Sequence, residues 1–135
     1  MDTTGMHRMD RQVIQTGEAP AAIGPYSQAV LAGGVLYCSG QIGLDPASGE
    51  LVPGGFEAEA RQVLANLAAV ARGAQMTLAH AIKLTVYVVD LADFPKLNGI
   101  LATVLAEPYP ARATVEVSAL PRGARVEIDM VATAN

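Results

Sequence analysis

The sequence predicts an α+β protein, in which a mixed β-sheet carries two amphipathic helices packed side by side on one face. Three observations predict this class. Short runs rich in β-branched residues stand near both ends of the chain and between two helical segments. The two helical segments repeat apolar residues at the spacing of one helix face. Glycine and proline stand at the joins between segments, where turns are expected.

The first part of the chain is expected to form strands. A strand is predicted over Gln12–Gln15, and a loop punctuated by proline and glycine follows over 17–25. Ala29–Leu31 and Val35–Ser39 flank Gly33-Gly34, a pair typical of a two-residue hairpin turn. These segments therefore predict a first strand followed by a hairpin.

Two helices follow from the apolar periodicity, with a strand over Ile82–Val89 between them. The first helix begins at Phe56 and ends at Gly73, a good C-terminal stop. Its apolar stripe is Phe56, Ala60, Val63, Leu64, Leu67, Val70 and Ala71. The second helix is predicted from Asp93 to Ala106. Its stripe is Phe94, Leu97, Leu101, Val104 and Leu105.

Two strands, Ala111–Ser118 and Arg125–Ala132, are predicted to close the chain. Apolar residues alternate with polar ones in the last three strands, and the apolar set is expected to lie under the helices. That set is Ile82, Leu84, Val86, Val88, Ala113, Val115, Val117, Val126, Ile128 and Met130. The opposite face carries charge, hydroxyls and Tyr87, and is either half-buried against another subunit or solvated. If the two strands form a hairpin, the preferred register places Arg112 opposite Asp129, because it avoids facing like charges.

Composition narrows the class of function. The net charge is −4 and the lysines and arginines are scattered, so nucleic-acid binding is not expected. No apolar run approaches the roughly 20 residues of a membrane span, and no segment resembles a secretion signal. The single cysteine excludes an internal disulfide and fits a reducing, cytoplasmic location. Residues 1–10 are expected to form a flexible tail, and residues 11–135 a single domain.

Few side chains suit metal or nucleophilic chemistry. His7 and His80 do not stand at a metal-ligand spacing, and with one cysteine no metal site is predicted. Cys38 lies in a strand pattern, which favours a buried small hydrophobe over a nucleophile. No phosphate-binding loop or serine elbow is present.

Arg112 is the strongest candidate for a binding group. It enters a strand directly after Pro110-Ala111, and its permanently charged guanidinium can form two parallel hydrogen bonds to a carboxylate. The alternative is an arginine paired with Asp129 or solvated at a strand end. Glu127 is a candidate base one strand away, although strand glutamates commonly face solvent.

Several segments together resemble the RidA (reactive imine deaminase) family, also called the YjgF family. In chain order they are 21–29 (AAIGPYSQA), 38–42 (CSGQI), 86–91 (VYVVDL), 93–94 (DF), Asn98, 110–112 (PAR), 115–117 (VEV), 120–121 (LP) and 126–128 (VEI). The resemblance implies a chorismate-mutase-like subunit and a homotrimer with clefts between subunits. It also implies hydrolysis of 2-imino acids, such as 2-iminobutanoate and 2-iminopropanoate, to 2-oxo acids and ammonia, without a cofactor.

The resemblance also implies roles for individual residues. Arg112 would hold the substrate carboxylate, and Glu127 would orient or activate the attacking water. Four residues would line the cleft: Tyr26, Ser39, Gly40 and Asn98. Thr114, a further substrate contact, stands where the family's well-known deaminases usually have cysteine.

The chain also departs from the family in two places near these residues. The second helix has Leu101, Val104 and Leu105 where aromatic residues are common, and the segment from Asn98 to Arg112 is shorter than usual. A non-catalytic trimer that binds small carboxylates or regulates a partner is therefore the alternative hypothesis. A third, endoribonuclease activity, has been carried by some members, and the net charge of −4 argues against it.

Overall fold

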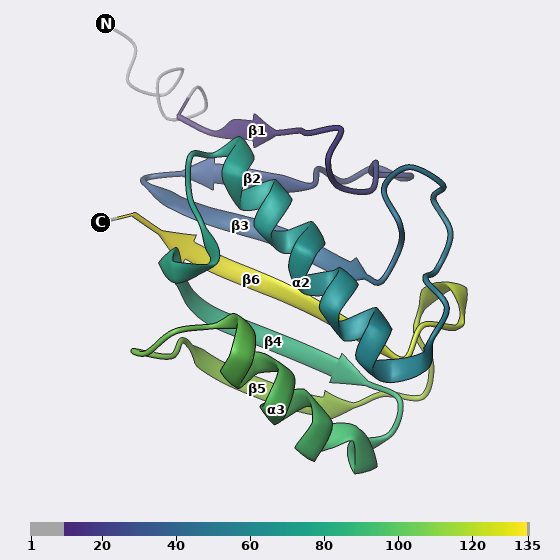
Figure 1. Cartoon of the computed structure of the whole chain (residues 1–135). Helices are drawn as coiled ribbons and strands as arrows, with labels where there is room; N and C mark the ends of the chain where they lie inside the picture. Colours follow the sequence, from purple (N-terminus) through teal and green to yellow (C-terminus); the bar gives the residue numbers. More distant parts are fainter. Residues whose placement is uncertain (1–9, 135) are drawn as a thin grey trace, which may run out of the picture.

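Six strands form one mixed sheet in the computed structural model, which describes residues 10–134 (Figure 1). The order across the sheet is β1-β2-β3-β6-β4-β5; β4 and β5 run parallel, and the other neighbours run antiparallel. The strands are β1 (Gln12–Ile14), β2 (Ala29–Ala32), β3 (Val35–Ile42), β4 (Ala81–Val88), β5 (Ala111–Glu116) and β6 (Val126–Thr133). The helices are α2 (Gly55–Gly73) and α3 (Phe94–Val104), with short 3-10 turns at Leu78–His80, Leu91–Asp93 and Pro121–Gly123.

The predicted hairpin is confirmed. Ala32 pairs with Val35, so Gly33 and Gly34 form a two-residue turn between β2 and β3. Both glycines have positive φ angles, 59° and 78°, which a type I′ turn requires and which other residues adopt at a cost.

Both helices lie on the same face of the sheet, as predicted (Figure 1). Every residue of the predicted α2 stripe is buried and packs against strand residues such as Leu36, Leu84 and Ile128. The α3 stripe was partly wrong: Leu97, Ile100 and Leu101 are its buried residues. Phe94 and Val104 are each more than one third exposed, because α3 covers the edge of the sheet and reaches the core with one side only.

The last two strands do not form the predicted hairpin. β6 is inserted between β3 and β4, and β5 pairs with β4 alone, in parallel. The residue beside Arg112 is therefore Leu84 rather than Asp129. The predicted register was wrong because these two strands, although adjacent in sequence, are not neighbours in the sheet.

The face assigned to β5 was also wrong. Arg112 and Thr114 pair with the buried Leu84 and Val86, so they lie on the side of the sheet that the helices cover. Val115 pairs with Tyr87 on the opposite, open face and is 43% exposed. Alternation shows which residues share a face, but it does not show which face lies under the helices.

β4 contains one further departure from regular alternation. Its register against β6 shifts between Ala81 and Lys83, which marks a β-bulge. The extra residue turns Ile82 outward, 47% exposed, and Ala81 takes the buried position instead.

Within residues 10–134, no helix is long and apolar enough to cross a membrane. The tail predicted over residues 1–10 falls, except for Asp10, outside the described residues.

Candidate active site

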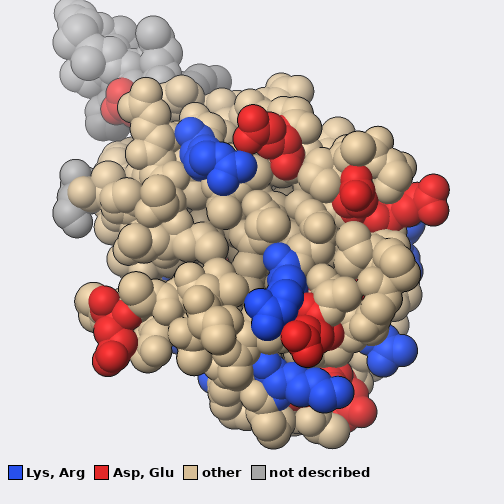
Figure 2. Space-filling view, viewed as in Figure 1, with Lys and Arg blue, Asp and Glu red and all other residues tan. Residues whose placement is uncertain are grey.

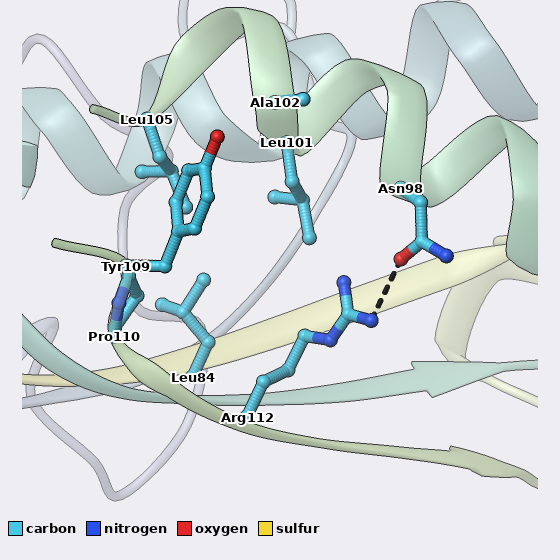
Figure 3. Close-up of a pocket in the computed structure, with 8 residues that line it drawn as sticks. All are labelled: Leu84, Asn98, Leu101, Ala102, Leu105, Tyr109, Pro110 and Arg112. Atoms are coloured by element: carbon cyan, nitrogen blue, oxygen red, sulfur yellow. Dashed lines mark hydrogen bonds between the residues drawn. The ribbon is translucent and has the colours of Figure 1, made fainter. Parts of the chain in front are cut away.

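Arg112 lies at the edge of the sheet where β5 begins. Pro110 fixes the backbone two residues earlier, and the pairing of Arg112 with Leu84 directs its side chain toward α3. Figure 3 shows the guanidinium between this strand and the helix above it. The arginine predicted as the centre of the site is thus held between two elements.

Two residues of α3 hold the guanidinium. Arg112 Nη2 donates a hydrogen bond to Asn98 Oδ1 at 2.7 Å, and the guanidinium carbon lies 5.2 Å from the centre of the Phe94 ring. Phe94 and Asn98 are four residues apart, so one turn of helix presents both to the same cation. No carboxylate of residues 10–134 forms an ion pair with Arg112. The alternative of a pair with Asp129 is therefore wrong, and the cation can still accept an anionic ligand.

A pocket of about 330 Å³ opens beside this cation. Its polar lining comes from Arg112 and Asn98, and its apolar lining comes mainly from Leu84, Leu101 and Leu105. Tyr109, in the segment before β5, completes one wall. Charge at one end and apolar surface elsewhere are the features of a site for a small amphipathic anion.

Thr114 lies two residues beyond Arg112 on the same face. Its hydroxyl is buried and has no hydrogen-bond partner among the described residues. A buried hydroxyl without a partner costs on the order of 1–3 kcal/mol, so such a group is well suited to receive a hydrogen bond from a ligand or a second chain, or to donate one.

Glu127 belongs to a second group of residues, on the open face of the sheet. It lies on β6 beside Gly40, at the point where the register between β3 and β6 shifts. A Cβ atom at Gly40 would collide with the carboxylate of Glu127, so the carboxylate depends on the absence of a side chain there. A second pocket, of about 120 Å³, is lined by Glu127, Gly40 and Tyr26 among others.

Burial and the neighbouring Asp129 set the electrostatics around this second group. Burial, and then the charge of Asp129, raise the pKa of Glu127. Tyr87 donates a hydrogen bond to Asp129 at 3.0 Å, which raises the pKa of the Tyr87 hydroxyl. Burial, and then Asp129, raise the pKa of Cys38 to about 12. Cys38 is therefore a buried thiol, as predicted, and not a nucleophile.

Ser39 is hydrogen-bonded to the backbone of the segment that precedes β2 within the same chain. Its hydroxyl donates a hydrogen bond to the carbonyl of Ser27 at 2.6 Å, and its backbone N–H donates to the carbonyl of Gln28. Ser39 therefore joins the middle of β3 to the segment that carries Tyr26. The side chain of Tyr26 is about half exposed.

The seven predicted site residues thus fall into two groups. The first, here called the arginine group, contains Arg112, Asn98 and Thr114. The second, here called the glutamate group, contains Glu127, Tyr26, Ser39 and Gly40. The two groups lie on opposite faces of the sheet, because Arg112 shares a face with Leu84, whereas Glu127 pairs with Tyr87 on the other face.

Sequence reasoning missed two residues of the arginine group. Phe94 was assigned to the core, although its spacing of four residues from Asn98 places both on one helical face. Tyr109 lies between two prolines in an irregular segment, where no periodicity could place it. Among residues 10–134, no cluster of three or more possible ligands could hold a metal ion.

The fold and the arginine group define a small α+β protein with an anion pocket at the edge of its sheet. The chain belongs to the Endoribonuclease L-PSP family, whose model matches residues 16–134. It is 50% identical over 127 residues to the 2-iminobutanoate/2-iminopropanoate deaminase of Mus musculus, covering 94% of each chain.

Solved structures agree with this assignment. RidA from the Antarctic bacterium Psychrobacter sp. PAMC 21119 is 48% identical with a TM-score of 0.88, covering 90% of this chain and 98% of that one. E. coli TdcF with bound serine is 35% identical with a TM-score of 0.84, covering 92% and 99%. The resemblance to the RidA family and the predicted fold class are therefore confirmed. The expectation of a deaminase-like hydrolase is confirmed by the similarity to relatives that are named as 2-iminobutanoate/2-iminopropanoate deaminases.

Proposed function

We propose that this protein hydrolyses 2-imino acids of the 2-iminobutanoate and 2-iminopropanoate type to 2-oxo acids and ammonia. The active sites lie in clefts between the subunits of a homotrimer. The names of relatives up to 50% identical support the reaction. The pocket beside Arg112 supports a small carboxylate substrate.

The observation that carries this proposal is the separation of the arginine group from the glutamate group. Arg112 points to the helix side of the sheet, whereas Glu127 lies on the open side, with β4 between their strands. One substrate cannot touch both side chains of the same subunit. A site that uses both takes Arg112 from one copy and Glu127 from a neighbouring copy.

The open face of the sheet supports such an assembly. Tyr37 and Val115 lie on it and are 52% and 43% exposed. Half-buried polar residues, including Thr85 and Asp129, lie between them. Apolar side chains exposed next to partly buried polar groups are characteristic of surfaces that contact another protein.

The reaction needs little from the protein, because imines already hydrolyse in water. A water oxygen forms a bond to the imine carbon and gives up one proton, and the electron pair of the C=N bond moves to nitrogen, which takes up a proton. The amino group of the resulting carbinolamine takes up a further proton, the hydroxyl loses its proton as the C=O bond forms, and the C–N bond breaks to release ammonia. One water is consumed and no electrons are transferred, so positioning and proton transfer suffice.

Each proposed residue has a physical role in these steps. The free edge of the Arg112 guanidinium binds the substrate carboxylate, and Asn98 fixes its orientation. The Thr114 hydroxyl is available for a further hydrogen bond. Glu127 accepts a proton from the attacking water, and its raised pKa suits a group that must bind and release protons. Tyr26, Ser39 and Gly40 form the wall beside it.

Endoribonuclease activity has less support, although the family description includes it. Figure 2 shows acidic side chains beside the basic ones on the face that carries the helices. Arg61, Arg72 and Arg125 each lie within 4 Å of a glutamate carboxylate. A net charge of −4, with three arginines of residues 10–134 paired in this way, does not favour binding of a phosphate backbone.

Co-assembly of two inactive variants tests the proposal. Arg112→Ala and Glu127→Gln should each reduce kcat/KM for enzyme-generated 2-iminobutanoate by on the order of 100-fold or more, as expected for loss of a charged contact. When the two variants are unfolded, mixed in equal amounts and refolded together, some clefts receive both native residues. A cyclic trimer should then recover about a quarter of the native activity.

The activity recovered by the mixture distinguishes a site shared between two subunits from a site within one chain. A mixture as inactive as its components would mean that each site lies within one chain, or that Arg112 and Glu127 do not share a site. Activity of Arg112→Ala equal to that of the native protein would overturn the deaminase itself. Subunit exchange should be verified by mass measurement of the mixed oligomers.

A further inference from the structure

The pocket beside Arg112 extends well beyond the space that a carboxylate needs. We propose that this pocket binds the substrate side chain and makes the protein selective for 2-imino acids with branched or aromatic side chains. This inference rests on the proposed function and specifies its substrate class. It concerns four residues that line the pocket, here called the apolar wall: Leu84, Leu101, Leu105 and Tyr109.

The apolar wall has a defined direction from the cation. Figure 3 shows Asn98 on one side of the guanidinium and Leu84 and Leu101 on the other, with Leu105 and Tyr109 farther along. A substrate whose carboxylate binds the free edge of Arg112 can therefore direct its side chain along α3. The polar group that orients the cation and the apolar surface do not compete for the same space.

The volume of the pocket exceeds what the smallest imino acids fill. It measures about 330 Å³, whereas a cavity of about 150 Å³ in a protein core is enough to hold benzene. A methyl or ethyl side chain would leave most of the apolar wall in contact with water. Each additional buried methylene is worth roughly a fourfold gain in binding, so larger apolar side chains are favoured.

Tyr109 supports the same conclusion. It lines the pocket and is 55% exposed, so its ring is accessible to a ligand. Leu84 and Leu101, in contrast, are almost fully buried and form a rigid floor. A rigid apolar floor with an exposed aromatic wall is the composition expected of a site for an apolar ligand group.

The two leucines of α3 keep the pocket open. Leu101 and Leu105 are four residues apart, so they lie on the same side of the helix, and both line the pocket. An aromatic ring at either position would occupy space that is open here.

The experiment compares substrates of different size. An amino acid oxidase generates the 2-imino acids of 2-aminobutanoate, leucine and phenylalanine in the assay, and kcat/KM is measured for each. The native protein should prefer the leucine- and phenylalanine-derived imines to 2-iminobutanoate by tenfold or more. Leu105→Phe fills the pocket and should reduce this ratio by at least tenfold.

Val104→Phe is the matched control. Val104 precedes Leu105 on the same helix, is 37% exposed and does not line the pocket. Val104→Phe should keep the native ratio between large and small imines, and the unfolding midpoints of both variants are measured to show that each is folded. A native preference for 2-iminobutanoate, or a ratio that Leu105→Phe does not change, would overturn the inference while leaving the deaminase intact.

Binding of products separates this inference from the proposed function. Calorimetry with 4-methyl-2-oxopentanoate and 2-oxobutanoate needs no turnover, and the branched acid should bind at least tenfold more tightly to the native protein. If the protein binds the branched acid selectively but hydrolyses no imine, the deaminase fails and the pocket stands. Equal affinity for the two acids would contradict the pocket, whatever the activity.

Discussion

The arginine group and the glutamate group differ in how their charged residue is controlled. Arg112 is held by contacts: Asn98 accepts a hydrogen bond from it at 2.7 Å, and the Phe94 ring lies against it. Glu127 is controlled by its environment, because burial and the nearby Asp129 raise its pKa. The first group fixes a charge in position, and the second adjusts the strength of an acid.

This difference follows from the chemistry of the two side chains. A guanidinium is charged at every accessible pH, so a protein can only position it. A carboxylate can be positioned and also tuned, because neighbouring acids and burial change the free energy of its charged form. Substitutions should therefore affect the glutamate group through geometry and pH, and the arginine group through geometry alone.

The largest expected effect comes from Gly40→Ala in the glutamate group. The new Cβ atom would displace the carboxylate of Glu127, and a misplacement of about 1 Å can cost on the order of 100-fold in rate. We expect kcat/KM for 2-iminobutanoate to fall by about that factor. Because the collision involves only a flexible side chain, the free energy of unfolding should change by less than about 1 kcal/mol.

Gly99→Ala, in α3, is the matched control. No heavy atom lies within 4 Å of a Cβ atom built at Gly99, and alanine is preferred to glycine within a helix by roughly 0.5–1 kcal/mol. This variant should therefore be slightly more stable than the native protein and retain its activity. Full activity in Gly40→Ala would show that the position of Glu127 is not critical.

The sequence predicted the elements far better than it predicted their arrangement in space. Apolar periodicity placed α2 correctly, because a helix that covers a sheet carries a complete stripe of buried residues. The order of β5, β4 and β6 could not be read in this way, since a parallel pair is set by long-range packing. Arg112 was consequently found as a candidate but assigned to the wrong face.

The same limit applies to the candidate site. The RidA motifs identified residues of both groups, but their order in sequence does not reveal that two faces of the sheet separate them. Phe94 could have been recognised from its spacing to Asn98, because both are on one helical turn. Tyr109 could not, since an irregular segment between prolines carries no periodic pattern.

The pH dependence of the rate gives the next largest effect and tests the tuning of Glu127. The carboxylate must be ionised to accept a proton from water, so kcat/KM should fall about tenfold per pH unit below its pKa. Because that pKa is raised, the decline should begin above the pH range of an ordinary glutamate. Glu127→Gln should lose this acid limb, as measured after the uncatalysed rate is subtracted at each pH.

Protein stability provides a readout that does not depend on activity. With a raised pKa, the folded state binds more protons than the unfolded state between the usual and the raised value, so stability falls as pH rises through this window. Glu127→Gln should therefore be stabilised relative to the native protein more at pH 7 than at pH 4. An identical difference at both values would contradict the raised pKa.

The smallest expected effect tests whether contacts alone control Arg112. Phe94→Leu removes the ring that lies 5.2 Å from the guanidinium but leaves the hydrogen bond to Asn98, and a cation–π contact at a partly exposed site contributes about 0.5–1 kcal/mol. Binding of 2-oxobutanoate should weaken by roughly two- to fivefold, with the same factor at pH 6 and pH 8, because a guanidinium does not titrate there. Phe94→Tyr keeps the ring face and should restore native affinity. A loss that varied with pH, or that tyrosine failed to restore, would mean that Phe94 acts through packing of α3 rather than through the cation.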